Sequence, residues 1–259
     1  MKQQQPTMTI QYASDLHLEF SQNRDFIKAN PIIPKGDILL LAGDIVPFAV
    51  MHKYADFFNY VSDHFQHTYW VPGNHEYYNF DLADRCGTLH EKIKDNVSLV
   101  NNTSIVHDDV QFIFSTLWSK ISPMYAWQIE RGMSDFHVIR YKGKLFSYED
   151  YNRLHEESIL FVKETLEAKS AIKNIVVSHH IPTFQNYPAQ YKGSVLSEAF
   201  AIELFDLIES DGPDYWIYGH HHSNVPDFTI GKTKMLTNQL GYVKCGEHVE
   251  FDGRKTIVV

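Results

Sequence analysis

The stretch DILLLAGD (residues 37–44) joins a β-rich run to a Gly-Asp pair, and the rest of the chain repeats this arrangement. Similar β-rich runs begin at residues 9 (TIQYAS), 68 (TYWV), 174 (NIVVS) and 215 (YWIYG), with longer segments of helical spacing between them. Strands that alternate with helices predict a layered α/β fold. With 259 residues and 44% hydrophobic content, the chain can build one sizeable core, so we expect a single domain over residues 1–259.

Three segments have the apolar spacing of helices: residues 47–66, residues 147–169 and residues from about 196 to 210. The second of them opens on a capping pattern that runs from Ser147 to Asp150. Between residues 97 and 116, and again from 227 to 259, strand-like runs follow one another without helices. These two regions predict antiparallel ribbons beside the alternating part.

The composition limits the partners and the compartment. Lys and Arg number 23 against 32 Asp and Glu, and this net charge of -9 disfavours an extended nucleic-acid surface. Cys86 and Cys245 alone cannot form a disulfide framework, which favours a reducing cytoplasm. The N-terminal stretch has no apolar core of a secretory signal, and no segment approaches the roughly 18 apolar residues of a membrane span. We therefore expect a cytoplasmic protein without a membrane partner, and no feature here indicates the oligomeric state.

A cluster of polar residues follows each of the five β-rich runs. The clusters are SDLHLE from residue 14, AGDIV from 42, VPGNHEYY from 71, VSHHIP from 177 and YGHHHSN from 218. In layered α/β folds the carboxyl ends of the strands converge on one edge of the sheet, where ligands bind. We therefore expect these clusters to meet in space.

The clusters contain donors that suit divalent metals. Carboxylate, imidazole and amide oxygen bind Zn, Mn, Fe and Co, and the set looks like two metal sites with a shared ligand. In an extended segment, side chains two apart point the same way, so both ends of Asp-x-His or His-x-His reach one site. The candidates are Asp15, His17, Asp44, Asn74, His75, His179, His220 and His222.

Each cluster also has a simpler explanation when it is taken alone. Asp15 can cap a turn near a surface histidine, GNHE can be a turn, and the pair His179-His180 can be satisfied by backbone groups. The metal interpretation rests on all five clusters together, each at a strand end and in a compatible order.

The ordered set resembles the calcineurin-like metallophosphoesterase superfamily, whose signature runs D-x-H, G-D, G-N-H-[ED], H and G-H-x-H. The resemblance covers residues 9–242, where TNQLGY looks like the family's terminal Asn-Pro-x-Gly-Tyr with Gln239 in place of proline. SDLHLEF and TLW (residues 116–118) make the chain similar to small cytosolic phosphohydrolases of the superfamily. The resemblance implies an α/β/β/α fold, a layered β-sandwich of mixed sheets flanked by helices.

The resemblance also implies a role for each position of the signature. Two divalent ions, Mn, Fe, Zn or Co, would be held, one by Asp15, His17 and His222 and the other by Asn74, His179 and His220. Asp44 would bridge them. His180 would lie behind the ligands or form pocket wall, where it is a candidate substrate contact, and His221 is expected to point away from both metals.

The expected chemistry follows from two metals about 3.5 to 4 Å apart that share a hydroxide of depressed pKa. This hydroxide would attack phosphorus in line with the leaving ester oxygen. His75 is the expected general acid, with Glu76 as its suggested partner.

The substrate is expected to be a small phosphate ester. GDIVPFAV lacks the extended GDxxDRG motif, and the arginines with which protein phosphatases of the superfamily grip a phosphomonoester are missing, which favours a phosphodiester or small organic phosphate. A loop and helix insertion at about 118–151 is expected near the active site, with Trp118 and His137 as candidate substrate contacts, although most of its rings can simply pack under a long loop.

The leading prediction is thus a dinuclear phosphodiesterase for small or nucleotide-like substrates. The alternatives are a phosphomonoesterase, a nuclease or pyrophosphatase on the same scaffold, and a non-catalytic binding module such as the retromer subunit with this fold. Retention of His75 and all seven ligand positions argues against the binding module.

Overall fold

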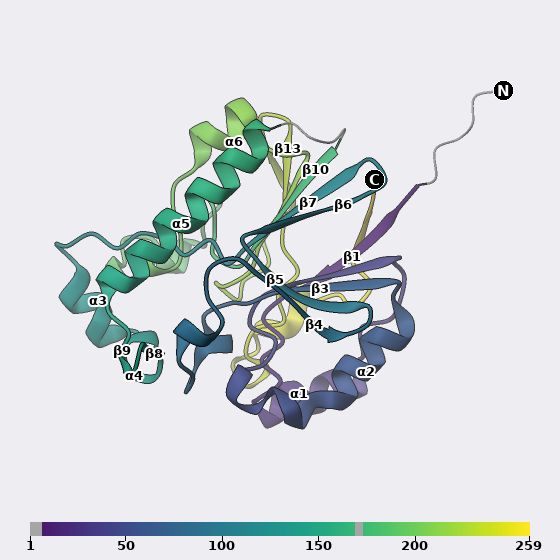
Figure 1. Ribbon diagram of the computed structural model, residues 1–259, viewed down its shortest axis with the longest axis horizontal. Helices are drawn as coiled ribbons and strands as arrows, with labels where there is room; N and C mark the ends of the chain where they lie inside the picture. Colours follow the sequence, from purple (N-terminus) through teal and green to yellow (C-terminus); the bar gives the residue numbers. More distant parts are fainter. Residues whose placement is uncertain (1–6, 169–172) are drawn as a thin grey trace.

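The computed structural model describes residues 7–168 and 173–259. Two six-stranded sheets face each other, and helices cover both outer faces, so that the layers run α/β/β/α (Figure 1). Among the described residues, no helix combines the length and the apolar character needed to cross a membrane.

The first sheet has the order β14-β1-β2-β3-β5-β4. Its four central strands are parallel, and β4 and β14 pair antiparallel at the two edges. The strands are β1 (Thr9–Ala13), β2 (Ile38–Ala42), β3 (His67–Val71), β4 (Leu89–Lys94), β5 (Val97–Asn101) and β14 (Thr256–Val258). Helices α1 (Ser21–Ala29) and α2 (Ala55–His64) lie on its outer face (Figure 1).

The second sheet has the order β12-β13-β11-β10-β7-β6, again with parallel central strands and antiparallel edges. Its strands are β6 (Thr103–His107), β7 (Val110–Ser115), β10 (Lys173–Ser178), β11 (Tyr215–Ile217), β12 (Phe228–Ile230) and β13 (Thr233–Leu236). Helices α5 (Tyr148–Glu167) and α6 (Phe205–Asp211) cover its outer face (Figure 1). The predicted sandwich with mixed sheets is confirmed.

The core lies in three layers because strand side chains alternate between faces. In β2, Leu39 and Leu41 join the cluster under α1 and α2, while Ile38 and Leu40 point between the sheets toward Phe112. All five residues of β2 are buried. Each Å² of apolar surface that is removed from water contributes about 25 cal/mol to stability, and β2 buries such surface on both of its faces. The strand is therefore a rigid support for the loop that follows it.

The predicted strands and two of the predicted helices are present, with shifted boundaries. Residues 47–66 form a 3₁₀ segment, η1 (Phe48–Tyr54), before α2. The Ser147 side chain accepts a hydrogen bond from the Asp150 N–H and so caps α5, as the pattern predicted. The predicted end of this helix at residue 169 lies outside the described residues.

The prediction of one helix from about 196 to 210 is wrong. Residues there form η5 (Val195–Ala199) and α6, and between them Ala201 makes a parallel bridge with Ile181. The backbone at 200–204 bonds to the chain just after β10 rather than to itself. This pairing brings Ala199 beside the polar clusters.

The two predicted ribbons are also more complex than expected. Strand β5 belongs to the first sheet, while β6 and β7 form an antiparallel pair in the second. In the C-terminal region, two 3₁₀ segments, η6 (Val243–Cys245) and η7 (Glu247–Glu250), separate β13 from β14. The sequence patterns gave no prediction of α1 or β4.

Within 118–151 the chain forms α3 (Ala126–Gly132), α4 (Asp135–Val138) and the hairpin of β8 (Arg140–Tyr141) and β9 (Lys144–Leu145).

Candidate metal centre

The five polar clusters meet at the carboxyl ends of β1, β2, β3, β10 and β11, as expected for a layered α/β fold. The expected extended geometry of the motifs is not present. Backbone φ is positive at five of the candidate ligands: Asp15 (55°), His17 (45°), Asp44 (56°), His220 (83°) and His222 (53°). Left-handed turns, rather than the two-residue period of a strand, therefore aim these side chains.

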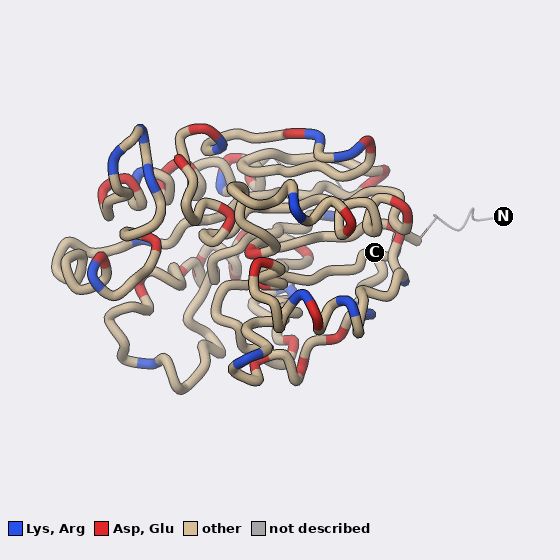
Figure 2. The backbone as a smooth tube through the Cα atoms, turned by 90° about the horizontal axis from the view of Figure 1, so that it is seen from below, with Lys and Arg blue, Asp and Glu red and all other residues tan. Residues whose placement is uncertain are grey.

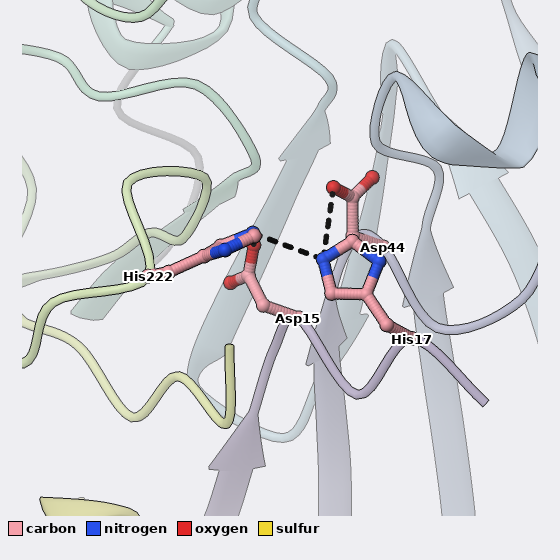
Figure 3. A group of neighbouring side chains, drawn as sticks. All are labelled: Asp15, His17, Asp44 and His222. Atoms are coloured by element: carbon pink, nitrogen blue, oxygen red, sulfur yellow. Dashed lines mark hydrogen bonds and ion pairs between the residues drawn. The ribbon is translucent and has the colours of Figure 1, made fainter. Parts of the chain in front are cut away.

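The first pocket consists of Asp15, His17, Asp44 and His222, whose ligand atoms all lie within 4.8 Å of one another (Figure 3). His17 Nε2 is 2.9 Å from His222 Nε2 and 3.6 Å from Asp44 Oδ2. His222 Nε2 is 3.4 Å from Asp15 Oδ1. Four donor side chains from three distant parts of the chain thus converge on one small region.

The second pocket consists of Asp44, Asn74, His179 and His220. His179 Nε2 lies 3.0 Å from His220 Nδ1, 3.2 Å from Asn74 Oδ1 and 3.5 Å from Asp44 Oδ1. Asp44 therefore offers Oδ2 to the first pocket and Oδ1 to the second. The structure brings all seven predicted ligands together and places His220 and His222 in different pockets.

Every histidine of the two pockets has its second ring nitrogen engaged elsewhere. In the first pocket, Nδ1 of His17 contacts Glu19 at 3.3 Å and Nδ1 of His222 contacts Glu247 at 3.0 Å. In the second pocket the partners are backbone oxygens, Ala42 O for His179 Nδ1 (3.0 Å) and Ala199 O for His220 Nε2 (3.3 Å). Such outer contacts fix the ring orientation and the tautomer that faces a metal.

Electrostatics within the pockets follow from burial and close charges. Burial, together with Glu76 and Asp15, raises the pKa of Asp44 well above its usual range. Burial opposes ionisation of Asp15 as well, but hydrogen bonding and charge from His222 hold the pKa of that carboxyl below its usual range. For His222, burial is outweighed by Asp15 and Glu247, which raise its pKa to about 9. Carboxylates concentrated in this way attract a cation.

Burial also disfavours the charged form of an imidazole, so it lowers the pKa of His17 in the first pocket to about 4 and acts in the same direction at the second pocket. It lowers the pKa of His179 to about 4 and that of His220 well below its usual range. Both rings are therefore neutral near pH 7, the form in which imidazole binds a metal. Carboxylate, neutral imidazole and amide oxygen at spacings of about 3 Å are what metal–ligand bonds of about 2 Å require, so these residues fit a divalent metal.

Two glycines make room for the carboxylates. A Cβ built on Gly73 would lie within 3.0 Å of Asp44 Oδ1, and one on Gly219 would lie within 3.0 Å of Asp15 Oδ2. Any larger residue at these positions would displace a candidate ligand, which gives the glycines of GNHE and GHHH a steric role.

His75 lies at the edge of the first pocket but belongs to neither ligand group as assigned. Its Nδ1 is 3.3 Å from Glu19 Oε1, its Nε2 is 3.3 Å from the Tyr242 hydroxyl, and its ring stacks on Tyr78 at 4.0 Å. The suggested partnership with Glu76 is not present. Glu76 instead accepts hydrogen bonds from the Asp44, Ile45 and Gly73 N–H groups and the Trp70 indole, and so ties together the loops after β2 and β3.

Several residues of the centre were not found from the sequence. Glu19 and Glu247 contact histidines, and the buried Asp135 accepts a hydrogen bond from Asn74 Nδ2 at 3.0 Å. Gln239, which stands where the family has proline, accepts the His222 N–H at 2.8 Å and donates to His221 Nδ1. Glu19 sits within SDLHLE and Gln239 within TNQLGY, whereas Glu247 and Asp135 had no sequence signal nearby.

A cavity of about 350 Å³ opens onto both pockets. His75, Tyr78, Asp135, His220, His222 and Tyr242 are among its lining residues. Its outer wall comes from two segments that are distant in sequence, residues 132–135 and residues 187–200. Ligands from both pockets therefore face one space of the size of small-molecule sites.

The three predicted substrate contacts do not line this cavity. Trp118 is 2% exposed and packs against Phe146 and Tyr151 in the core. His137 lies on the exposed side of α4, with Nε2 near the Arg131 carbonyl. His180 is fully buried behind the ligands, 4.3 Å from the His220 ring.

His221 lies outside both pockets. Its ring is buried near Tyr187 and Tyr218, and its Nδ1 accepts hydrogen bonds from the Gln239 amide and the Ser223 N–H. The middle histidine of the run therefore lines the cavity without belonging to either group of candidate ligands.

Comparisons with known proteins agree with this architecture. The calcineurin-like phosphoesterase family model matches residues 8–224. Uncharacterized protein L509 of Acanthamoeba polyphaga mimivirus is 34% identical over 260 residues, which cover 90% of this chain and 91% of the relative.

Solved structures show the same fold at low identity. A phosphopantetheinyl hydrolase from Mycobacterium tuberculosis superposes with a TM-score of 0.72 at 16% identity, covering 96% of this chain and 95% of the other. A dimetal phosphatase from Danio rerio has a TM-score of 0.50 at 12% identity, covering 97% and 91%. The family match, together with the buried Asp and His pockets, shows that the chain belongs to the calcineurin-like phosphoesterase family and is a metal-dependent phosphoesterase.

Proposed function

We propose that this phosphoesterase holds two divalent cations and hydrolyses phosphodiesters that carry small or nucleotide-like groups. Support for two cations comes from Asp44, which offers a different oxygen to each pocket. Mn, Fe, Zn and Co all accept the donor set. Bound there, two divalent cations would activate water and neutralise charge on the phosphoryl oxygens.

The charge of the cavity wall carries the diester proposal. Among the described residues that line the cavity none is Lys or Arg, whereas Asp44, Asp135 and Glu247 are acidic. A phosphomonoester dianion has one more negative charge than a diester and gains most from Lys and Arg side chains, which the described lining residues do not include. The wall therefore favours a monoanionic diester.

His75 is the proposed proton donor to the leaving oxygen. Glu19 engages Nδ1, which leaves Nε2 on the cavity side near the Tyr242 hydroxyl. In this arrangement Nε2 carries the proton toward an alkoxide that departs from phosphorus. Asp44 is the second proposed catalytic residue, because its two oxygens face the two pockets. Its Oδ1 also accepts a hydrogen bond from the backbone N–H of His75 at 2.9 Å.

Hydrolysis of bis-p-nitrophenyl phosphate and p-nitrophenyl phosphate after loading with Mn, Fe, Zn or Co tests the proposal. We expect the diester to be hydrolysed faster, and Asp44→Ala to abolish turnover of both. A faster monoester would replace the diester proposal with the phosphomonoesterase alternative. Absence of turnover with every metal would favour the binding module.

A leaving-group series tests His75 separately. p-Nitrophenolate departs without a proton, whereas an alkoxide needs one, so His75→Ala should slow alkyl diesters by about 10²–10⁴-fold and aryl diesters much less. Equal slowing of both series would remove the proton-donor role. Cyclic nucleotides and a phosphopantetheinyl diester are suitable natural probes, the latter because a phosphopantetheinyl hydrolase shares the fold.

The nuclease alternative receives little support from the charge distribution. Lys and Arg are scattered over many loops and alternate with Asp and Glu, without a basic stripe along the described chain (Figure 2). A duplex or long single strand needs such a stripe to neutralise successive phosphates.

We also propose that the chain works as one domain, with 118–151 as an insertion beside the site. The contact of Asp135 with Asn74 and the cavity wall at 132–135 support this arrangement. Cys86 and Cys245 are free thiols, which supports a reducing compartment, the cytoplasm.

A further inference from the structure

We propose that the outer wall of the cavity is a subsite for an uncharged organic group with an aromatic or aliphatic face. This proposal rests on the phosphodiesterase function above and names the substituent that the phosphate carries. The subsite is formed by residues 132–135 at the α3–α4 junction and by residues 187–200 before and within η5.

The two wall segments meet each other and contact the metal centre directly. A Cβ built on Gly132 would lie 3.0 Å from Leu196 Cδ2, so the segments close against one another at this point. On the inner side, the Phe200 ring stacks on the His220 ring with centroids 4.5 Å apart. A group attached to a phosphate at the two pockets therefore meets this wall.

Most side chains with which these segments line the cavity are rings, aliphatic groups or hydroxyls, and none is Lys or Arg; Lys192 belongs to the second segment but does not line the cavity. Its side chains include Met133, Tyr187, Tyr191, Leu196, Ser197 and Phe200. Glu247, an acidic residue, also lines the cavity. A second anionic group on the substrate would face this carboxylate without a counter-charge, whereas a base or aryl ring would stack on the tyrosines.

A matched pair of nucleotide diesters tests the subsite. The probes are the p-nitrophenyl ester of thymidine 5′-phosphate with a free 3′-hydroxyl and the same ester with a 3′-phosphate. For the wild-type protein we expect kcat/KM to be at least about tenfold lower for the 3′-phosphate ester, because the added dianion meets no cation.

A cation added to the wall should reduce this preference for the ester with a free 3′-hydroxyl. Ser134 is exposed and lines the cavity, so Ser134→Arg should reduce the discrimination between the two esters at least about tenfold, mainly through KM. Gln128→Arg is the matched control, because Gln128 is exposed on α3 but does not line the cavity. Equal kcat/KM for both esters, or equal effects of the two arginines, would overturn the subsite. Failure of every diester to turn over would instead count against the phosphodiesterase function.

A separate observation assigns a positioning role to Asp135, which we infer fixes the orientation of the Asn74 amide. Asn74 Nδ2 donates to Asp135 Oδ1 at 3.0 Å, and as a result Asn74 Oδ1 faces His179 Nε2 at 3.2 Å. An amide can rotate to exchange its oxygen and nitrogen, but only the oxygen binds a metal. A carboxylate accepts and cannot donate, so it selects the orientation in which the oxygen faces the second pocket.

The surroundings hold Asp135 in place for this purpose. It is 2% exposed, and its second oxygen accepts the Tyr78 hydroxyl at 3.0 Å. Tyr78 in turn stacks on His75 at 4.0 Å. The segment 118–151, which supplies Asp135, is thereby connected to a metal ligand that follows β3.

Metal titration of the chelator-treated protein by equilibrium dialysis tests this role. Asp135→Ala should weaken the binding of one Mn²⁺ per chain by about 10–100-fold and leave the other unchanged. Asp135→Asn keeps an oxygen for Asn74 and should restore most of the affinity. Tyr78→Phe is the matched control, because it removes the other hydrogen bond of Asp135 and should keep both metals.

Circular dichroism of each metal-free variant separates a folding defect from a positioning defect. Two unchanged Mn²⁺ affinities in a folded Asp135→Ala would overturn the inference. Equal weakening of both affinities would do the same, since a general loss of structure does not select one pocket. If Asp135→Ala does not fold, the test rests on Asp135→Asn. Mn²⁺ affinities of this variant that are as low as those of Asn74→Ala would also count against the positioning role of Asp135.

Discussion

The two candidate metal pockets share Asp44 but differ in the groups that contact the second ring nitrogens of their histidines. In the first pocket, the carboxylates of Glu19 and Glu247 contact His17 and His222. The second ring nitrogens of the histidines in the second pocket contact carbonyl oxygens, those of Ala42 and Ala199, instead of carboxylates. Since a carboxylate makes an imidazole a stronger donor and adds negative charge, the first pocket should bind a divalent cation more tightly than the second.

The largest effect should come from the residue that the pockets share. Asp44→Asn removes the negative charge between them, so both pockets should lose affinity and turnover should fall at least about 1000-fold. Metal content per chain by mass spectrometry and diester hydrolysis check this. One tightly bound metal in this variant would show that the first pocket does not depend on Asp44.

Single ligands should separate the two pockets. His222→Ala should remove the tighter metal and His220→Ala the weaker one, each lowering kcat by about 10²–10³-fold. Titration with Co²⁺, followed by its absorption spectrum, shows whether a variant has lost the tighter or the weaker binding step. If both variants lose the same step, the two pockets are not ordered in affinity.

The carboxylates behind the first pocket provide a finer test. Glu247→Gln keeps the shape but removes the charge beside His222, so the affinity of the tighter metal should fall by about 10–100-fold. The weaker metal should change little. Equal losses at both steps would mean that Glu247 acts on the whole centre through its net charge, and the contrast between the pockets would disappear.

The smallest effect on metals is expected at the middle histidine of the run. His221→Ala should keep both metals, because the ring contacts Gln239 and Ser223 rather than either pocket. The free energy of unfolding should fall by about 1–3 kcal/mol, since the variant leaves buried donors without their acceptor. Denaturant unfolding and metal analysis together check this, and loss of one metal would place His221 in the centre.

The alternation of strands and helices predicted a layered α/β fold and the convergence of the clusters, because buried strands and their terminal polar residues form a local, repeated pattern. The sandwich of two mixed sheets was expected from the resemblance to the superfamily. It did not predict the groups behind the ligands. Asp135 and Glu247 come from segments without a signature, and their contacts depend on how distant loops fold together. The buried position of Trp118 was not predictable for a related reason, since an aromatic residue beside a site can equally well pack beneath it.

The expected period-two geometry was wrong for a different physical reason. It assumed that Asp15 and His17 continue the strand, but β1 ends at Ala13 and both residues have positive φ. Likewise, the expected helix near 196–210 breaks because its backbone pairs with Ile181. In both places the deviation from the local rule occurs at the functional edge, where long-range contacts outweigh local preference.

The left-handed backbone at Asp15, Asp44 and His220 also limits how the centre can change during evolution or in a mutant library. Asn, Asp and His tolerate this conformation far better than other side chains apart from glycine, and a β-branched residue there is strained by about 1–3 kcal/mol. Variants that survive selection for folding alone should therefore be drawn from the few residue types that also bind metals. A chain that has lost its activity can retain much of a metal-binding composition at this edge, and can regain a ligand by a single substitution.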